Sequence, residues 1–159
     1  MSTVALERIY WGVVITLISM IIPTHWMGVI AGGPTGSSDR FIWMFGFVVE
    51  IFVTGEVEIY WLFLTNYLHI ILWFVISLPT TLLVLILSGK ILKNLKKIRN
   101  YQTTDIEIIR ISTERLFITV ILFIVLNVLI YRIPIFGSVT LIIGIILIKS
   151  GIKKYINSS

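Results

Sequence analysis

The sequence contains no cysteine, and charged residues make up only 13% of its 159 positions. The absence of cysteine excludes structural disulfides, thiolate metal sites and thiol catalysis. Hydrophobic residues make up 57% of the chain, and the mean hydropathy is +1.01. A soluble domain of this composition would have too few polar residues to cover its surface. We therefore expect one integral-membrane domain that covers residues 1–159.

Motifs for catalysis and nucleotide binding are also missing. No Ser/His/Asp arrangement can be assembled, and the glycines do not form a phosphate-binding loop after a strand. We therefore expect no catalytic residues and a chain that is not an enzyme on its own. The bias towards Ile, Lys and Asn suggests an AT-rich or thermophilic prokaryotic source.

The net charge of +5 is distributed unevenly along the chain. Residues 90–99 hold five cations and no acid, and three further lysines lie near the C-terminus. Such clustering indicates membrane orientation, with the basic side in the cytoplasm, and does not indicate nucleic-acid binding. We expect the basic stretch to contact lipid headgroups through its cations, Lys90, Lys93, Lys96, Lys97 and Arg99.

Long apolar runs predict an all-α, multi-pass protein of the cell membrane with cytoplasmic N- and C-termini. About four transmembrane helices are expected, at residues 9–30, 60–88, 116–132 and 135–149. They would be joined by an outer segment, a cytoplasmic loop and a short outer turn; the first two are residues 31–58 and 89–115.

Two shorter helices are expected between the spans. Residues 41–54 are strongly aromatic but would reach only about 21 Å as a helix, which favours an interfacial or re-entrant helix in an outer aromatic belt. The alternative makes this segment a fifth span and places the N-terminus outside. After residue 88, the spacing of Ile91, Leu95 and Ile98 predicts an amphipathic helix that lies along the cytoplasmic leaflet.

The two histidines, His25 and His69, are expected at similar depth near the outer boundary of the membrane. Two imidazoles on neighbouring spans can hold a b-type haem, or a copper or zinc ion with Glu50, Glu56, Glu58 or Asp39 as a further ligand. The interpretation that we favour makes both histidines interfacial residues that bond to headgroups, water or backbone.

Glu50 is an ionisable residue within an apolar run. At membrane depth it would suggest a proton or ion pathway, with Arg40 or His69 as its partner. If the segment is interfacial, Glu50 faces water, and we favour this alternative.

Three glycines recur every seven residues in the last apolar run and predict a helix face that allows close approach of another helix: Gly137, Gly144 and Gly151. We favour a small non-catalytic subunit that packs against lipids and other membrane-protein subunits of respiratory or transport machinery. The second hypothesis is a haem- or metal-bearing redox subunit that uses His25 and His69. The third is an oligomeric channel or carrier that uses Glu50.

Overall fold

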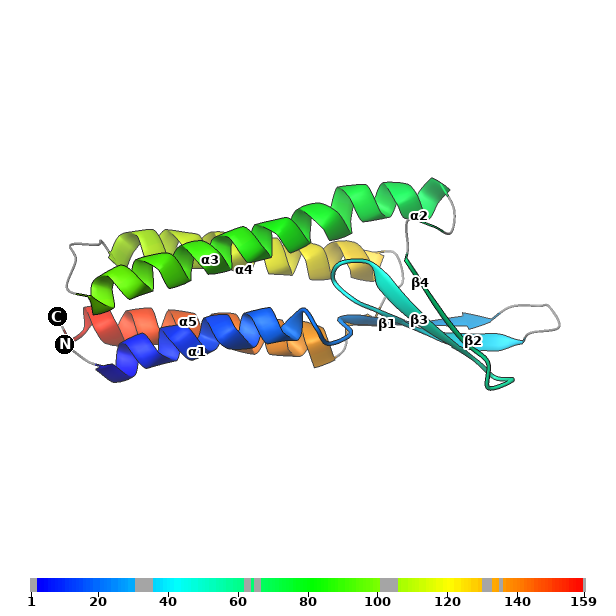
Figure 1. The fold of residues 1–159 in the computed structure, drawn as a ribbon, viewed down its shortest axis with the longest axis horizontal. Helices are drawn as coiled ribbons and strands as arrows, with labels where there is room; N and C mark the ends of the chain where they lie inside the picture. Colours follow the sequence, from blue (N-terminus) through cyan, green and yellow to red (C-terminus); the bar gives the residue numbers. More distant parts are fainter. Residues whose placement is uncertain are drawn as a thin grey trace.

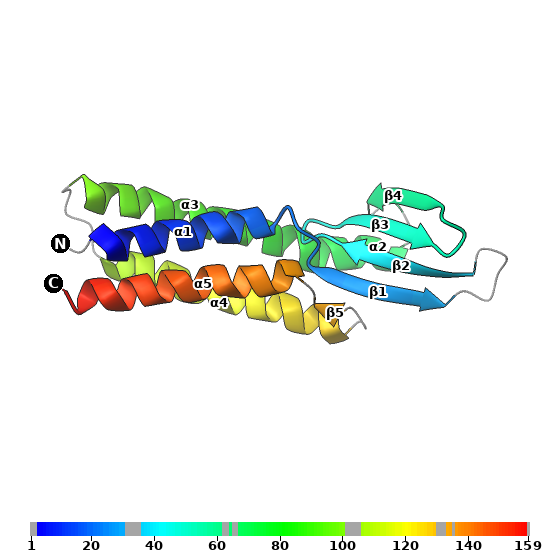
Figure 2. The same ribbon diagram turned by 90° about the horizontal axis from the view of Figure 1, so that it is seen from below.

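The computed structural model describes residues 3–30, 36–61, 64, 67–100, 106–129, 133–134 and 136–158. These residues form an elongated helical bundle with a β-sheet that projects from one end (Figure 1). The long helices are α1 (Thr3–Ser19), α3 (Leu78–Arg99), α4 (Ile106–Leu129) and α5 (Phe136–Ile156). Both chain termini lie at the end of the bundle that is remote from the sheet (Figures 1 and 2).

The sheet is antiparallel throughout and has the strand order β4-β3-β2-β1-β5. Four strands come from the chain between α1 and α2, and a two-residue strand comes from the connection between α4 and α5. The strands are β1 (His25–Ile30), β2 (Ser37–Ile42), β3 (Phe47–Phe52), β4 (Val57–Trp61) and β5 (Ile133–Pro134). The prediction of an all-α fold is therefore wrong, because the protein combines a helical bundle with a sheet.

Residues 41–54 form no helix, so both the interfacial and the re-entrant interpretation are wrong. They comprise the end of β2, a turn and β3, with burial at every second position from Ile42 to Glu50. Gly46 and Gly55 have φ values of +89° and +88°, a backbone region that favours glycine, and each closes a turn between strands. A two-residue period combined with glycine turns builds a β-meander.

The first two helices begin and end differently from the predicted spans. α1 ends at Ser19, and the chain from His25 onwards is β1, so the predicted helix at 9–30 is too long at its outer end. Pro23 lies between the two elements and cannot donate a backbone hydrogen bond to continue the helix. The predicted second helix, 60–88, begins too early because Tyr60 and Trp61 belong to β4.

A long helical segment links the sheet to the bundle. α2 (Tyr67–Leu72) continues through a π-helical turn, η2 (Trp73–Ser77), into α3, and Pro79 in the first turn of α3 accounts for the irregularity. The Trp73 indole donates to the Phe45 carbonyl (2.9 Å), and the Thr81 hydroxyl donates to the Met44 carbonyl (3.3 Å). These two bonds attach the β2–β3 turn to the helix.

The basic stretch belongs to the bundle. α3 continues without interruption to Arg99, and Ile91, Leu95 and Ile98 are buried in the bundle core. The predicted amphipathic spacing is present, but neighbouring helices cover the apolar face. The prediction of a separate surface helix within a loop at 89–115 is wrong.

Two described helical segments are long and apolar enough to cross a membrane, Trp73–Arg99 and Phe136–Ile156. The prediction of an all-α protein with four spans is corrected accordingly. The last helix also runs seven residues past the predicted end at 149, to Ile156.

Candidate functional site

A buried polar cluster crosses the middle of the sheet. Glu50 on β3 is 3% exposed and pairs in register with Arg40 on β2 and Glu58 on β4. Arg40 Nε lies 2.9 Å from Glu50 Oε2, and the Tyr60 hydroxyl donates to the same oxygen at 2.7 Å. The Ser38 hydroxyl donates to the other oxygen, Oε1. Three strands thus contribute to a cluster centred on one carboxylate.

The surroundings hold Glu50 in its charged form. Burial alone would raise its pKa, but the hydrogen bonds from Ser38, Arg40 and Tyr60, together with the Arg40 charge, outweigh burial and lower the pKa. Burial and the bond to the Glu50 carboxylate raise the pKa of Tyr60. A carboxylate fixed in this way crosslinks strands and is poorly suited to carrying protons near neutral pH.

The lowered pKa of Glu50 predicts that the sheet loses stability in acid. A carboxyl group whose pKa is lower in the folded state stabilises the fold above its unfolded pKa, about 4.3, and loses that contribution as the pH falls through the folded pKa. We expect the difference in unfolding temperature between wild type and Glu50→Gln, measured in detergent by circular dichroism, to shrink from pH 6 towards about pH 2. Parallel profiles of the two proteins over this range would contradict the role assigned to Glu50.

The predicted metal ligands do not gather around an ion site. Glu56 lies in the turn before β4 and Glu58 on β4, both exposed, while Glu50 is engaged within the sheet. Among the described residues, no three His, Asp or Glu side chains lie close enough to hold a metal ion.

The two predicted haem ligands occupy different elements. His25 begins β1 and is fully buried where the sheet meets the bundle. Its Nδ1 atom lies 3.1 Å from the Thr24 hydroxyl, and its ring packs edge-on against Phe123 of α4, with 5.1 Å between centroids. His69 lies in α2, and its side chain is outside the described part of the chain.

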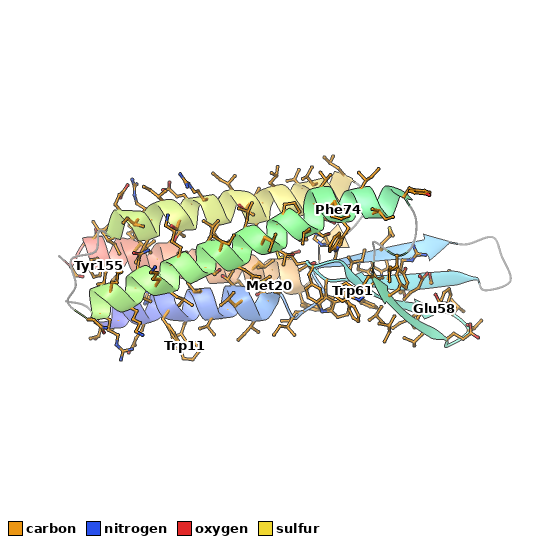
Figure 3. All side chains as sticks on the ribbon, turned by 45° about the horizontal axis from the view of Figure 1, so that its top comes forward. Trp11, Met20, Glu58, Trp61, Phe74 and Tyr155 are labelled. Atoms are coloured by element: carbon orange, nitrogen blue, oxygen red, sulfur yellow. The ribbon has the colours of Figure 1, made fainter. Side chains whose placement is uncertain are left out.

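The sheet face opposite the polar cluster is apolar. Phe41, Val49 and Ile59 form one cross-strand row over β2, β3 and β4, and Ile59 is 64% exposed. Where this face meets the bundle, Trp61 packs against the rings of Phe45 and Phe47 (Figure 3). The aromatic residues that the sequence placed in an outer belt therefore lie on the sheet and at its junction with the helices.

Comparison of the chain with protein-family models, curated proteins and solved structures finds no match. Any function must therefore be argued from the surfaces of the molecule.

The outer surface of the bundle is also apolar. Large aliphatic side chains point outwards along its helices, among them Ile86 of α3 (63% exposed), Ile118 of α4 and Ile146 of α5 (56% exposed). Trp11 projects away from α1 (Figure 3). Exposed apolar surface on this scale is typical of contact with lipid or with other proteins.

The three predicted glycines lie on the face of α5 that contacts α1 and the segment that follows it. A Cβ atom on Gly137 would lie 2.6 Å from the Pro23 carbonyl oxygen, and one on Gly151 would lie 2.8 Å from the Ala5 carbonyl oxygen. Around Gly144 the close neighbours are Thr16 and Gly12 of α1, and sequence reasoning missed both. The helix that packs closely against these glycines is therefore α1 of the same chain.

Charge is concentrated at the end of the bundle where the termini lie. Every lysine, and every arginine except Arg40 and Arg132, falls in the first part of α1 or α4 or in the last part of α3 or α5. These four helix ends lie together (Figure 1). The bundle therefore has one basic end and one end capped by the sheet.

Proposed function

We propose that this chain is a non-catalytic membrane subunit whose two candidate spans, Trp73–Arg99 and Phe136–Ile156, lie in a bilayer and whose sheet joins it to a second copy outside the bilayer. The observation that carries the proposal is the apolar surface that the fold leaves uncovered on both the bundle and the sheet. Membership of respiratory or transport machinery stays a prediction from the sequence.

Helix burial supports the placement in a bilayer. Less than half of the most apolar window in each candidate span, Trp73–Arg99 and Phe136–Ile156, is buried within the chain. A core helix of a soluble protein is mostly buried, whereas a lipid-facing helix exposes apolar side chains to hydrocarbon. The basic end fits the cytoplasmic side, since cytoplasmic flanks carry an excess of Lys and Arg. The termini would then be cytoplasmic and the sheet would lie outside.

The free edge of the sheet supports association through β4. The Phe52 amide donates to the Glu56 carbonyl at 2.9 Å, so these two residues form a hydrogen-bonded pair. From this pair, hydrogen-bonded and non-hydrogen-bonded pairs alternate along β3 and β4. By that alternation, the backbone groups of Val57 and Ile59 point away from β3. No other described strand pairs with this edge. An unpaired apolar edge is a template for strand addition.

Two copies of β4 fit each other in one antiparallel register. Pairing about Ile59 places Val57 opposite the partner's Trp61 and Glu58 opposite the partner's Tyr60. The outward-pointing backbone groups of the two Ile59 residues then face each other, and no two carboxylates face each other across the pair. The strand is thus complementary to itself, as a two-fold interface requires.

A charge on this edge is expected to dissociate the dimer. Ile59→Lys places a cation at the centre of the proposed strand pair, and we expect it to weaken self-association at least tenfold, or about 1.4 kcal/mol. The measurement is light scattering of the detergent-solubilised protein over a concentration series. Val53→Lys, in the neighbouring exposed turn, is the matched control and should remain dimeric. A wild-type protein that is monomeric at every concentration, or a dimeric Ile59→Lys variant, would refute the proposal.

The two alternative functions gain no support from the described geometry. Glu50 lies in the sheet, outside the bundle, and its oxygens are bound by three partners, which does not suit an ion path. His25 packs against Phe123 at the junction, and the side chain of His69 lies outside the described part of the chain.

A further inference from the structure

A groove opens between α1 and α3 at the basic end of the bundle. Its volume is about 570 Å³, within the range of small-molecule sites. Its apolar lining comes from both helices, and the polar side chains are Thr3, Glu7, Lys96, Arg99 and Asn100. The apolar members are Leu6, Tyr10, Leu92 and Leu95.

The groove exists because α1 packs closely against α5 and less closely against α3. Gly12 and Gly144 bring the backbones of α1 and α5 into contact, so that a Cβ on Gly12 would lie 2.8 Å from the Ile148 amide nitrogen. On the side of α1 that faces α3, larger side chains such as Leu6 and Leu95 line the groove.

Along α3, the lining of the groove is apolar first and positively charged at the end of the helix, which matches the tail and headgroup of an amphiphile. On α3, Leu92 and Leu95 come first, and Lys96 and Arg99 follow within the next turn towards the helix end. On α1 the order from the open end is Thr3, Leu6, Glu7 and Tyr10, so the carboxylate lies between Leu6 and Tyr10. With Lys96 and Arg99 on α3, the lining of the groove holds two cations and one carboxylate and has a net positive charge.

We infer that this groove binds one anionic phospholipid, with an acyl chain against the leucines and Tyr10 and the phosphate at Lys96 and Arg99. Basic pockets between membrane helices on the cytoplasmic side suit anionic headgroups, because the cation and the headgroup meet at the same depth. The inference rests on the proposed placement of the bundle in a bilayer. A free phosphate would leave the apolar half of the groove unfilled, and so the ligand is the lipid.

Native mass spectrometry of the full chain in neutral detergent tests the site. Phosphatidylglycerol and phosphatidylcholine with identical acyl chains are titrated separately, and we expect one phosphatidylglycerol to bind with clear preference. Lys96→Gln/Arg99→Gln should weaken that binding about 30-fold, since each basic residue near an anionic headgroup contributes roughly fivefold. Lys153→Gln/Lys154→Gln removes the same charge from exposed positions of α5, at the same end of the bundle but outside the groove, and should change binding less than about twofold.

Further measurements distinguish a failure of the lipid site from a failure of the proposed function. Leu6→Trp fills the apolar part of the groove and should also weaken phosphatidylglycerol binding, whereas millimolar inorganic phosphate should not displace the lipid. Equal losses in the two double variants, or equal binding of both lipids, would overturn the inference. If the protein remains in membranes after alkaline extraction but shows no headgroup preference, only the lipid site fails. If it is released without detergent, the proposed function fails as well.

Discussion

Gly144→Ala is expected to lower the unfolding temperature of the protein by about 4–12 °C, corresponding to about 2–3 kcal/mol. The added Cβ would lie 2.8 Å from the Gly12 carbonyl oxygen and 2.9 Å from the Thr16 amide nitrogen. Both neighbours are backbone atoms of α1, so no side-chain rotation can make room for the methyl group. α1 and α5 would have to move apart along their whole contact. Thermal unfolding in detergent, followed by circular dichroism, measures the effect.

Gly89→Ala is the matched control for this prediction. Gly89 is also helical, but a Cβ there would meet nothing within 4 Å. Alanine favours a helix over glycine by about 0.8–1 kcal/mol, so this variant should be as stable as wild type or more stable. Equal effects of the two alanine substitutions would show that the contact between α1 and α5 is not as close as described.

Glu50→Ala is expected to destabilise the protein by about 3 kcal/mol, because it removes one partner of a largely buried ion pair. Arg40 would lose its counter-ion, and the hydroxyls of Ser38 and Tyr60 would lose their acceptor. We expect the unfolding temperature to fall by about 6–12 °C.

Glu58→Ala provides the comparison for Glu50→Ala. Glu58 occupies the position next to Glu50 across the ladder, but it is exposed. A surface substitution of this kind changes stability by about 0.5 kcal/mol or less. If the two alanine variants unfold at the same temperature, the polar cluster does not hold the sheet together.

Helix faces could be predicted from the sequence, but the surfaces that cover them could not. The spacing of Ile91, Leu95 and Ile98 marks one face of a helix, and that face is buried. The same spacing suits a helix on a leaflet or a helix in a bundle, because both media are apolar. Gly144 likewise indicates close approach, whereas its neighbour Gly12 lies far away in the sequence.

The sheet escaped prediction because both of its faces carry apolar residues. Buried Ile42 and Val48 alternate with apolar residues on the exposed face, such as Phe41 and Val49, so the segment resembles a continuous hydrophobic run. A usable signal was Gly55, which lies in a short turn between two runs rich in β-branched residues and indicates a hairpin.

The polar cluster could be predicted only in part. An ionisable residue in an apolar run needs a partner, and Arg40 was one of the two partners considered for Glu50. Ser38 and Tyr60 could not be foreseen, because their approach to Glu50 depends on the register of three strands. A shift of one residue would move every side chain to the other face.

Cysteine accessibility tests the placement of the bundle in a bilayer most directly. Because the chain has no cysteine, single substitutions can be labelled without background. Ile86 and Ile146 are 63% and 56% exposed in the fold, so only surrounding lipid would shield cysteines at these positions when the purified protein is reconstituted into membranes. In open membrane sheets treated with a water-soluble maleimide, we predict that Glu58→Cys reacts fully while Ile86→Cys and Ile146→Cys stay unreacted until denaturation. Reaction of all three cysteines at the same rate would contradict the account.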